Sequence, residues 1–255
     1  MSRFNLCDNI MNWFEWESYY NEIKNSINLS FEKDIDAAKL LNEQLDEIEV
    51  EETLREVAIL IDNNTCHIFG CGPSLEFNIE YVMEKKIIKR QDVIIAADGA
   101  TKALLMQDIA PDIIVSDLDG DIEAIKKANK RGSIIIIHAH GDNLQKIQEL
   151  TKEYRRRIGS VQIKPFGLLK NFGGFTDGDR AVFLAEHFNA RKICLYGFDF
   201  GKIVGKYSKA RFLNDIEGTE EKITKLKIAK DLISMLHEKR AVEIKNCTEL
   251  YLNPP

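Results

Sequence analysis

From residue 65 onward, short apolar runs alternate with longer segments of amphipathic pattern. The runs are continuous rather than alternating, which is typical of strands covered on both faces. A strand followed by a helix, repeated along the chain, predicts a parallel sheet with right-handed crossovers. The expected strands are residues 65–70, 92–97, 112–116, 133–138, 160–164, 191–197 and 241–246.

The segments between these runs carry apolar residues near every third or fourth position, which predicts helices that cover the sheet. They are residues 74–86, 99–108, 121–131, 142–157, 177–189 and 217–238. Residues 63–255 are therefore expected to form an α/β domain with a doubly wound, mostly parallel, Rossmann-like sheet.

Residues 1–62 have a different character, because they are polar, helical in pattern and free of glycine and proline. Aromatic residues recur near helical spacing between Trp13 and Tyr20, and apolar residues do so between Asp34 and Ile61. We expect a helical N-terminal subdomain that caps the main domain. A lid over a substrate, or a contact between two copies in a homodimer, is the alternative.

Composition excludes some classes of partner. The 255 residues carry a net charge of −6, so no overall basic field attracts nucleic acid or acidic lipid. No apolar run approaches the length of a membrane span, and the first 16 residues lack the pattern of a secretory signal. The five cysteines form no C-x-x-C pair, which favours reduced thiols and a cytoplasmic protein.

Small, acidic and turn-forming residues follow strand after strand. They occupy residues 70–74, 98–101, 117–121, 138–143, 172–180 and 197–201. The carboxyl ends of parallel strands share one edge of a sheet, and ligands bind at that edge. The pattern predicts one ligand site built from several loops.

The first of these loops contains Gly70, Gly72, Pro73 and Ser74 directly before an expected helix. Glycine lets a backbone approach a ligand closely, and free N–H groups at a helix N-terminus bind phosphate. The loop matches neither the dinucleotide fingerprint nor the lysine-containing P-loop. A tight turn in which Ser74 caps the helix is the alternative.

Asp117 and Asp119 follow the third strand two residues apart. If the strand geometry continues, their side chains share a face, and two adjacent carboxylates repel unless a cation lies between them. Oxygen ligands of this kind select Mg²⁺. Asp121 is as well explained by capping of the next helix as by metal binding.

His138 and His140 are also two residues apart at a strand end, and Asp142 follows them. Such a pair is compatible with a zinc site, but no second histidine pair supports it. Asp142 and Asn143 either cap the next helix, or Asp142 joins the magnesium ligands.

The glycine-rich loop before residue 177 is flanked by aromatic residues. Phe172, Phe175 and Phe198 either present a face to a flat heteroaromatic ring or belong to the core. Arg180 either contacts phosphate or pairs with the acids beside it. The basic segment 202–211 either closes over an anionic substrate or is a solvated loop.

Taken together, the loops resemble the archaeal 6-hydroxymethyl-7,8-dihydropterin pyrophosphokinase family, which is related to the thiamin pyrophosphokinases. The resemblance covers roughly residues 60–250. The motifs that carry it are GCGPSL, AADGAT, PDIIVSDLDGD, HAHGDN, FGGFTDGDRAVFLA and LYGFDFG.

The resemblance implies a thiamin-pyrophosphokinase-like fold with ATP as co-substrate and Mg²⁺ as cofactor. It implies transfer of a diphosphate group to the hydroxymethyl group of the pterin, with release of AMP, in folate or methanopterin biosynthesis. An Asp-Gly pair and a D-x-D loop in the relatives correspond here to Asp98-Gly99 and to Asp117 with Asp119.

Site roles follow from these considerations together. We expect catalysis by Asp117, Asp119 and Asp142, with Asp117 and Asp119 also binding metal. We expect ATP to be bound by Gly70, Gly72, Pro73, Ser74, Asp98, Gly99 and Arg180. We expect the pterin to be bound by Phe175, Thr176, Asp177, Asp179 and Asp199. Alternatives are a thiamin pyrophosphokinase, a relative that uses a nucleotide-sugar, and a non-catalytic nucleotide-binding module.

Overall fold

The computed structural model describes residues 13–27 and 29–249. Within them, a seven-stranded parallel sheet has the strand order β5-β4-β3-β2-β1-β6-β9. Its strands are β1 (Thr65–Phe69), β2 (Val93–Ala97), β3 (Ile113–Ser116), β4 (Ile134–Ala139), β5 (Arg157–Val161), β6 (Lys192–Tyr196) and β9 (Glu243–Asn246). The predicted α/β class with a parallel sheet is confirmed.

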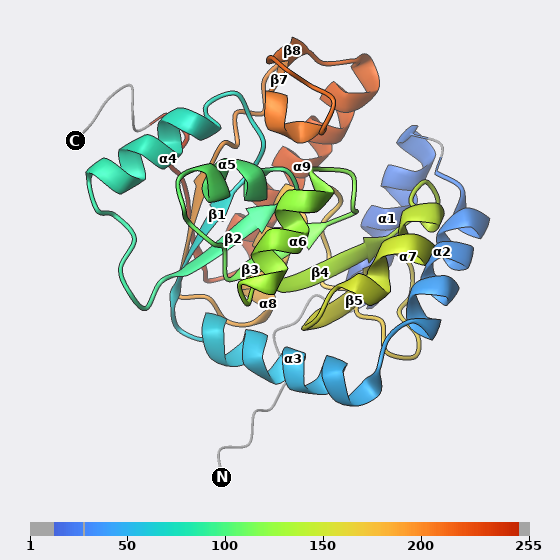
Figure 1. Cartoon of the computed structure of the whole chain (residues 1–255). Helices are drawn as coiled ribbons and strands as arrows, with labels where there is room; N and C mark the ends of the chain where they lie inside the picture. Colours follow the sequence, from blue (N-terminus) through green and yellow to red (C-terminus); the bar gives the residue numbers. More distant parts are fainter. Residues whose placement is uncertain (1–12, 28, 250–255) are drawn as a thin grey trace.

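Helices cover both faces of this sheet (Figure 1). They are α4 (Leu75–Glu84), α5 (Ala100–Met106), α6 (Ile122–Lys130), α7 (Leu144–Leu150), α8 (Asp177–His187) and α9 (Glu220–Lys239). Figure 1 shows α5 and α6 in front of the strands, whereas α8 lies behind them against β1, β2 and β3. The chain is therefore doubly wound, as predicted.

Three further helices precede the sheet: α1 (Trp13–Ile27), α2 (Phe31–Glu43) and α3 (Glu47–Ile61). Their buried faces belong to the same hydrophobic cluster as the central strands. The Trp16 ring packs edge-on against Phe183 of α8 with 6.2 Å between ring centroids, while Phe14 in the same helix is 82% exposed. The helical N-terminal region thus packs on the α/β part through one stripe of each helix.

Two elements differ from the sequence-based expectation. The fifth strand begins at Arg157 rather than near residue 160, because α7 ends at Leu150 and a 3₁₀ turn follows it. A two-stranded antiparallel hairpin, β7 (Ile203–Val204) with β8 (Ile216–Glu217), was not predicted. Strands of two residues are too short to give a hydrophobic period.

The cysteines are consistent with the expected reduced state. Cys66, Cys71, Cys194 and Cys247 are free thiols, and Cys7 lies outside the described residues, as does most of the N-terminal stretch considered above. In the described part of the chain, every helix is too short or too polar to cross a bilayer. The cytoplasmic location stays a prediction.

Candidate functional site

The winding of the sheet changes direction between β1 and β6. After β1 the chain proceeds through β2, β3 and β4 to β5, and it then crosses by α8 to β6 on the other side of β1. The loops after β1 and β6 consequently lead to opposite faces and open a crevice at the carboxyl edge, where such sheets bind ligands.

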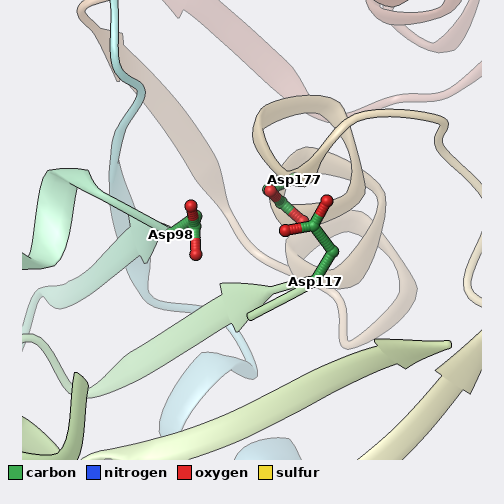
Figure 2. A group of neighbouring side chains, drawn as sticks. All are labelled: Asp98, Asp117 and Asp177. Atoms are coloured by element: carbon green, nitrogen blue, oxygen red, sulfur yellow. The ribbon is translucent and has the colours of Figure 1, made fainter. Parts of the chain in front are cut away.

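Three carboxylates meet at this edge (Figure 2). Asp98 follows β2, Asp117 follows β3, and Asp177 is the first residue of α8. One oxygen atom from each lies within 4.8 Å of the others. In the described part of the chain, no other group of three or more His, Cys, Asp or Glu side chains has this geometry.

The backbone at Asp98 is left-handed, with φ of 44°. Its N–H donates to the Val115 carbonyl at 2.8 Å, and its carboxylate accepts from the Ser116 hydroxyl at 2.5 Å. A Cβ atom at Gly120 would lie 2.5 Å from that carboxylate, so glycine is needed there. Burial and the charge of Asp117 raise the pKa of Asp98 to about 6.

Asp117 is held by the loop that follows β4. The Nε2 atom of His140 lies 3.4 Å from its carboxylate, and the Asn143 side-chain amide donates to its carbonyl at 2.8 Å. Burial raises the pKa of Asp117, but the hydrogen bond from His140 and the charges of His140, Lys209 and Lys146 outweigh it, so the pKa is lowered. Asp117 is therefore the member of the group that ionises most readily.

Asp177 stands at the N-terminus of α8, where Thr176 and Asp179 form a capping box. Burial and the charges of Asp117 and Asp98 raise its pKa well above the ordinary value, against the attraction of Arg180 and Lys222. The three carboxylates thus lie close together in a largely buried place, where a cation would offset the repulsion between them.

Asp119 is placed outside this group. Strand β3 ends at Ser116 and Leu118 has φ of 65°, so the alternation of the strand does not extend to Asp119. Its carboxylate instead forms ion pairs with Lys146 and Lys209. A role for Asp119 as a metal ligand stays a prediction.

Asp121 in the loop after β3 and Asp142 in the loop after β4 lie outside the group of three carboxylates. Asp121 caps α6 through the Ala124 N–H at 3.0 Å and pairs with Lys102 at 2.9 Å, as the capping alternative expected. Asp142 is exposed and outside the three-carboxylate group. Its backbone N–H donates to Nδ1 of His140 at 3.3 Å.

The zinc alternative gains no support from the geometry. His138 is buried, and its Nδ1 lies 3.3 Å from the Ser160 hydroxyl. Burial and the nearby charges of Arg180 and His140 lower its pKa well below the ordinary value. Neither His138 nor His140 belongs to the group with metal-binding geometry.

The loop before α8 is supported from within. Asp179 accepts from the N–H groups of Phe175 at 2.5 Å and Thr176 at 2.7 Å. Arg180 is buried and donates to the Phe175 carbonyl at 2.9 Å and to the Gln162 side chain at 3.1 Å. Phe175 packs against the core. These contacts fix Asp177 and do not test the ligand roles expected for its neighbours.

A cavity of about 110 Å³ opens beside the carboxylates, between the loops after β1 and β6. Gly70 and Gly72 line it, as do Asp98, Asp177 and the segment 197–200, whereas Pro73 and Ser74 do not. Phe198 is buried to 6% exposure, yet it lines both the core and this cavity. The edge of the sheet at which the sequence predicts a ligand site therefore holds a cavity beside Asp98 and Asp177.

Asp199 occupies the N-terminal end of α4. It accepts from the Ser74 hydroxyl at 2.8 Å and from the Ser74 N–H at 3.4 Å, and a Cβ atom at Gly72 would overlap its carboxylate. Ser74 is the N-cap residue of α4, as the alternative expected, but its side chain makes no capping bond. Because a carboxylate already lies at this helix N-terminus, phosphate is less favoured there.

The β7–β8 hairpin and the segment between its strands lie next to α5 and α9 (Figure 1), and this segment contacts α5. Ile203, Val204 and Ser208 line the cavity. Tyr207 is tied to Glu76 of α4 by a 2.7 Å hydrogen bond, and a Cβ atom at Gly99 would overlap the Tyr207 carbonyl. The basic segment 202–211, for which the sequence left closure over a substrate and a solvated loop as alternatives, is therefore packed beside the cavity.

Several residues of the site were missed by the sequence analysis: His140 as a partner of Asp117, Asn143, Lys209 and Lys222. Lys222 lies on α9 and lines the cavity. The sequence did signal the H-x-H pair and the basic segment that contains Lys209, but it gave no signal for a lysine on a distant helix.

Comparison with known proteins agrees with the resemblance. The family model described as 6-hydroxymethylpterin diphosphokinase MptE-like matches residues 40–205. Proteins named 6-hydroxymethyl-7,8-dihydropterin pyrophosphokinase are 44% identical in Methanocaldococcus jannaschii and 41% identical in Pyrococcus furiosus. The first alignment covers 91% of this chain and 99% of the relative, and the second covers 89% and 94%. The chain belongs to the MptE-like family of 6-hydroxymethylpterin diphosphokinases.

Proposed function

We propose that this protein transfers a diphosphate group from ATP to the hydroxymethyl group of 6-hydroxymethyl-7,8-dihydropterin and releases AMP, in folate or methanopterin biosynthesis. The names of the archaeal relatives support the reaction. The observation that carries it in this chain is the convergence of Asp98, Asp117 and Asp177 beside a cavity at the carboxyl edge of the sheet.

The donor set fits Mg²⁺. All three side chains offer hard oxygen ligands, and the pKa values of Asp98 and Asp177 are raised by burial and by repulsion within the group. When bound, Mg²⁺ would supply positive charge that offsets the negative charge of the ATP phosphates. His140 would hold Asp117 in orientation from behind, as outer hydrogen bonds do at metal sites.

Two lysines suit the phosphate chain of ATP. Burial lowers the pKa of Lys209, and the nearby charges of Asp117 and Asp98 oppose this effect. Lys209 therefore lies close to two of the carboxylates. Lys222 lines the cavity from α9. We place the polyphosphate between these lysines and the carboxylates, where the positive charges would balance the charge that moves to the leaving AMP.

The cavity suits the pterin ring. Phe198 and Phe200 lie on its wall and offer aromatic surface to a flat heterocycle. Asp199 lies between them in the sequence, and both of its hydrogen bonds from Ser74 go to Oδ2, so Oδ1 can receive the ring amino and N–H donors of a pterin. Asp199 is thus our choice among the acids expected to bind the pterin.

Asp177 is placed to receive the acceptor hydroxyl, because it belongs both to the carboxylate group and to the lining of the cavity. Its pKa is raised well above the ordinary value by burial and by its acidic neighbours. A carboxylate oxygen that is not bound to the cation can accept the proton of the hydroxyl as its oxygen bonds to phosphorus. We propose that Asp177 orients the hydroxymethyl group and takes up its proton.

The reaction is tested by incubating the protein with ATP and Mg²⁺ and with either the pterin alcohol or thiamin. We expect AMP and a diphosphorylated pterin with the first acceptor and no AMP with thiamin. AMP release with thiamin alone would establish the other acceptor. The absence of AMP with both acceptors would leave a binding module and contradict the proposal.

A further inference from the structure

The carboxylate of Asp34 lies buried on α2 at 3% exposure, far along the chain from the acidic loops. It accepts three hydrogen bonds: from the Tyr20 hydroxyl at 3.2 Å, from the Gln162 side-chain amide at 2.7 Å and from the Gly141 N–H at 2.8 Å. Removing a charged carboxylate from water costs free energy, so buried carboxylates are paired or hydrogen-bonded. Two of its donors, Gly141 and Gln162, connect Asp34 to the site formed by Asp98, Asp117 and Asp177.

The first branch runs through the loop after β4. Gly141 follows His140, whose Nε2 lies 3.4 Å from Asp117. The Asp142 N–H donates to Nδ1 of His140, so that Nδ1 is an acceptor and Nε2 carries the hydrogen that faces Asp117. By holding the Gly141 N–H, Asp34 fixes the backbone on which this ring orientation depends.

The second branch runs through Gln162 to the start of α8. The Gln162 side-chain oxygen accepts from Arg180 at 3.1 Å, and the same Arg180 nitrogen donates to the Phe175 carbonyl at 2.9 Å. Arg180 stands three residues after Asp177 and attracts the charges of Asp177, Asp117 and Asp34. This branch fixes the loop that presents Asp177.

The direction of every hydrogen bond in the second branch is set by chemistry. An arginine side chain only donates, so the oxygen of Gln162 has to face Arg180. The NH₂ group of Gln162 then faces residue 34, which has to be an acceptor. An ionised aspartate meets this requirement. An asparagine also has to accept from Gly141, so it would turn its own NH₂ group toward that of Gln162.

We propose that Asp34 is a positioning residue for the metal site, through which the N-terminal helices hold His140 against Asp117 and Asp177 in place. The inference rests on the proposed function only in assigning a cation to the carboxylates. It makes α2 a functional part of the site rather than a cover over it.

Two variants and their combination test the proposal. Asp34→Asn sets two donors against each other, and we expect the affinity for Mn²⁺, measured by electron paramagnetic resonance, to fall at least 10-fold. Adding Gln162→Glu moves the negative charge from position 34 to position 162 and restores an acceptor for each donor. We expect the double variant to recover Mn²⁺ affinity to within about 3-fold of the original protein.

The variant Gln162→Met tests the second branch without the first. It also provides a test if Asp34→Asn does not fold. It keeps the bond from Gly141 to Asp34 and removes the side-chain contacts of residue 162 with both Asp34 and Arg180. In the metal-free protein, we expect faster amide hydrogen exchange over residues 173–180 and unchanged exchange over residues 138–143. For Asp34→Asn, both segments should exchange faster.

Controls separate positioning from stability. Asp36→Asn lies on the same helix, with a side chain that is 65% exposed, and should change neither exchange nor affinity. Val57→Ala removes buried volume from α3 and should lower the melting temperature without lowering Mn²⁺ affinity. Unchanged Mn²⁺ affinity in Asp34→Asn, or no recovery in the double variant, would overturn the inference. Because these readouts need no turnover, a failed AMP assay would count against the proposed function alone.

Discussion

The Nε2 atom of His140 lies 3.4 Å from a carboxylate oxygen of Asp117, and Nδ1 of the same ring accepts from the Asp142 N–H. The ring therefore presents an N–H group to the acid that ionises most readily in the carboxylate group. Asp117 is oriented before any cation arrives, which lowers the cost of binding one.

His140→Ala should raise the Mg²⁺ concentration needed for half-maximal activity by about 10- to 100-fold, because the carboxylate loses its orienting donor. His140→Gln carries an amide hydrogen near the position of Nε2 and should recover most of the activity. A magnesium titration of both variants checks this. Equal losses in the two variants would show that the ring, and not its N–H group, matters.

Asp117 and Asp119 should behave differently despite their closeness in sequence. Asp119→Asn releases Lys146 and Lys209, so we expect a KM for ATP raised by about 5- to 20-fold with little change in Mn²⁺ affinity. Lys209→Gln should reproduce the effect on ATP. If Asp119→Asn lowered Mn²⁺ affinity as strongly as Asp117→Asn, Asp119 would itself be a ligand, as the sequence analysis expected.

Asp98 should make the metal-free protein less stable as pH rises. The pKa of Asp98 is raised from an ordinary 3.8 to about 6 in the folded protein, so the folded state binds this proton more tightly than the unfolded state does. The protein therefore loses stability as the pH rises from about 4 to about 6. Asp98→Asn should raise the free energy of unfolding at pH 8 by about 3 kcal/mol, with little change at pH 4. Asparagine keeps an acceptor for Ser116 and tolerates the left-handed backbone.

Denaturant unfolding without metal, at both pH values, measures this difference. Asp108→Asn, at an exposed position paired with Arg131, is a control that should change little. Mg²⁺ should stabilise the original protein more at pH 8 than at pH 5.5, because protons compete with it for the carboxylates, and it should stabilise Asp98→Asn much less. A destabilised Asp98→Asn protein at pH 8 would contradict the view that burial and the charge of Asp117 make the ionised form of Asp98 unfavourable.

Asp199→Asn should weaken pterin binding by at least 10-fold, since the amide can no longer accept two donors from the ring. The amide still accepts from Ser74, so the loop should remain in place. Fluorescence titration with the pterin alcohol measures the dissociation constant, and Mn²⁺ affinity should stay unchanged. Unaltered pterin affinity would move the pterin to another part of the cavity.

Much of this architecture follows from the sequence. Continuous apolar runs such as Ile113–Ser116 indicate strands that are buried on both faces, and the acids after them indicate the edge of the sheet where ligands bind. The sequence also indicated that the loops of β2, β3 and α8 meet. Which acid in each loop faces inward depends on single backbone angles. The positive φ of Leu118 separates Asp117 from Asp119, and no residue pattern reports it.

Contacts between distant segments were also beyond the sequence. Asp34 reads as one more polar residue of an amphipathic helix, yet it receives donors from Gly141 and Gln162. Arg180 suits a phosphate ligand by residue type, whereas the structure buries it against Gln162 and the Phe175 carbonyl. Side-chain partners of this kind depend on packing, which hydrophobic periodicity does not encode.

The central claim is that the carboxylates of Asp98, Asp117 and Asp177 hold the cation that carries diphosphate transfer. The most direct measurement is AMP formation from ATP and the pterin alcohol with Mg²⁺, compared between the original protein and Asp117→Asn. We predict one AMP for each diphosphorylated pterin in the original protein, and a rate at least 100-fold lower in the variant at equal melting temperature. A variant with a rate near that of the original protein would contradict the claim.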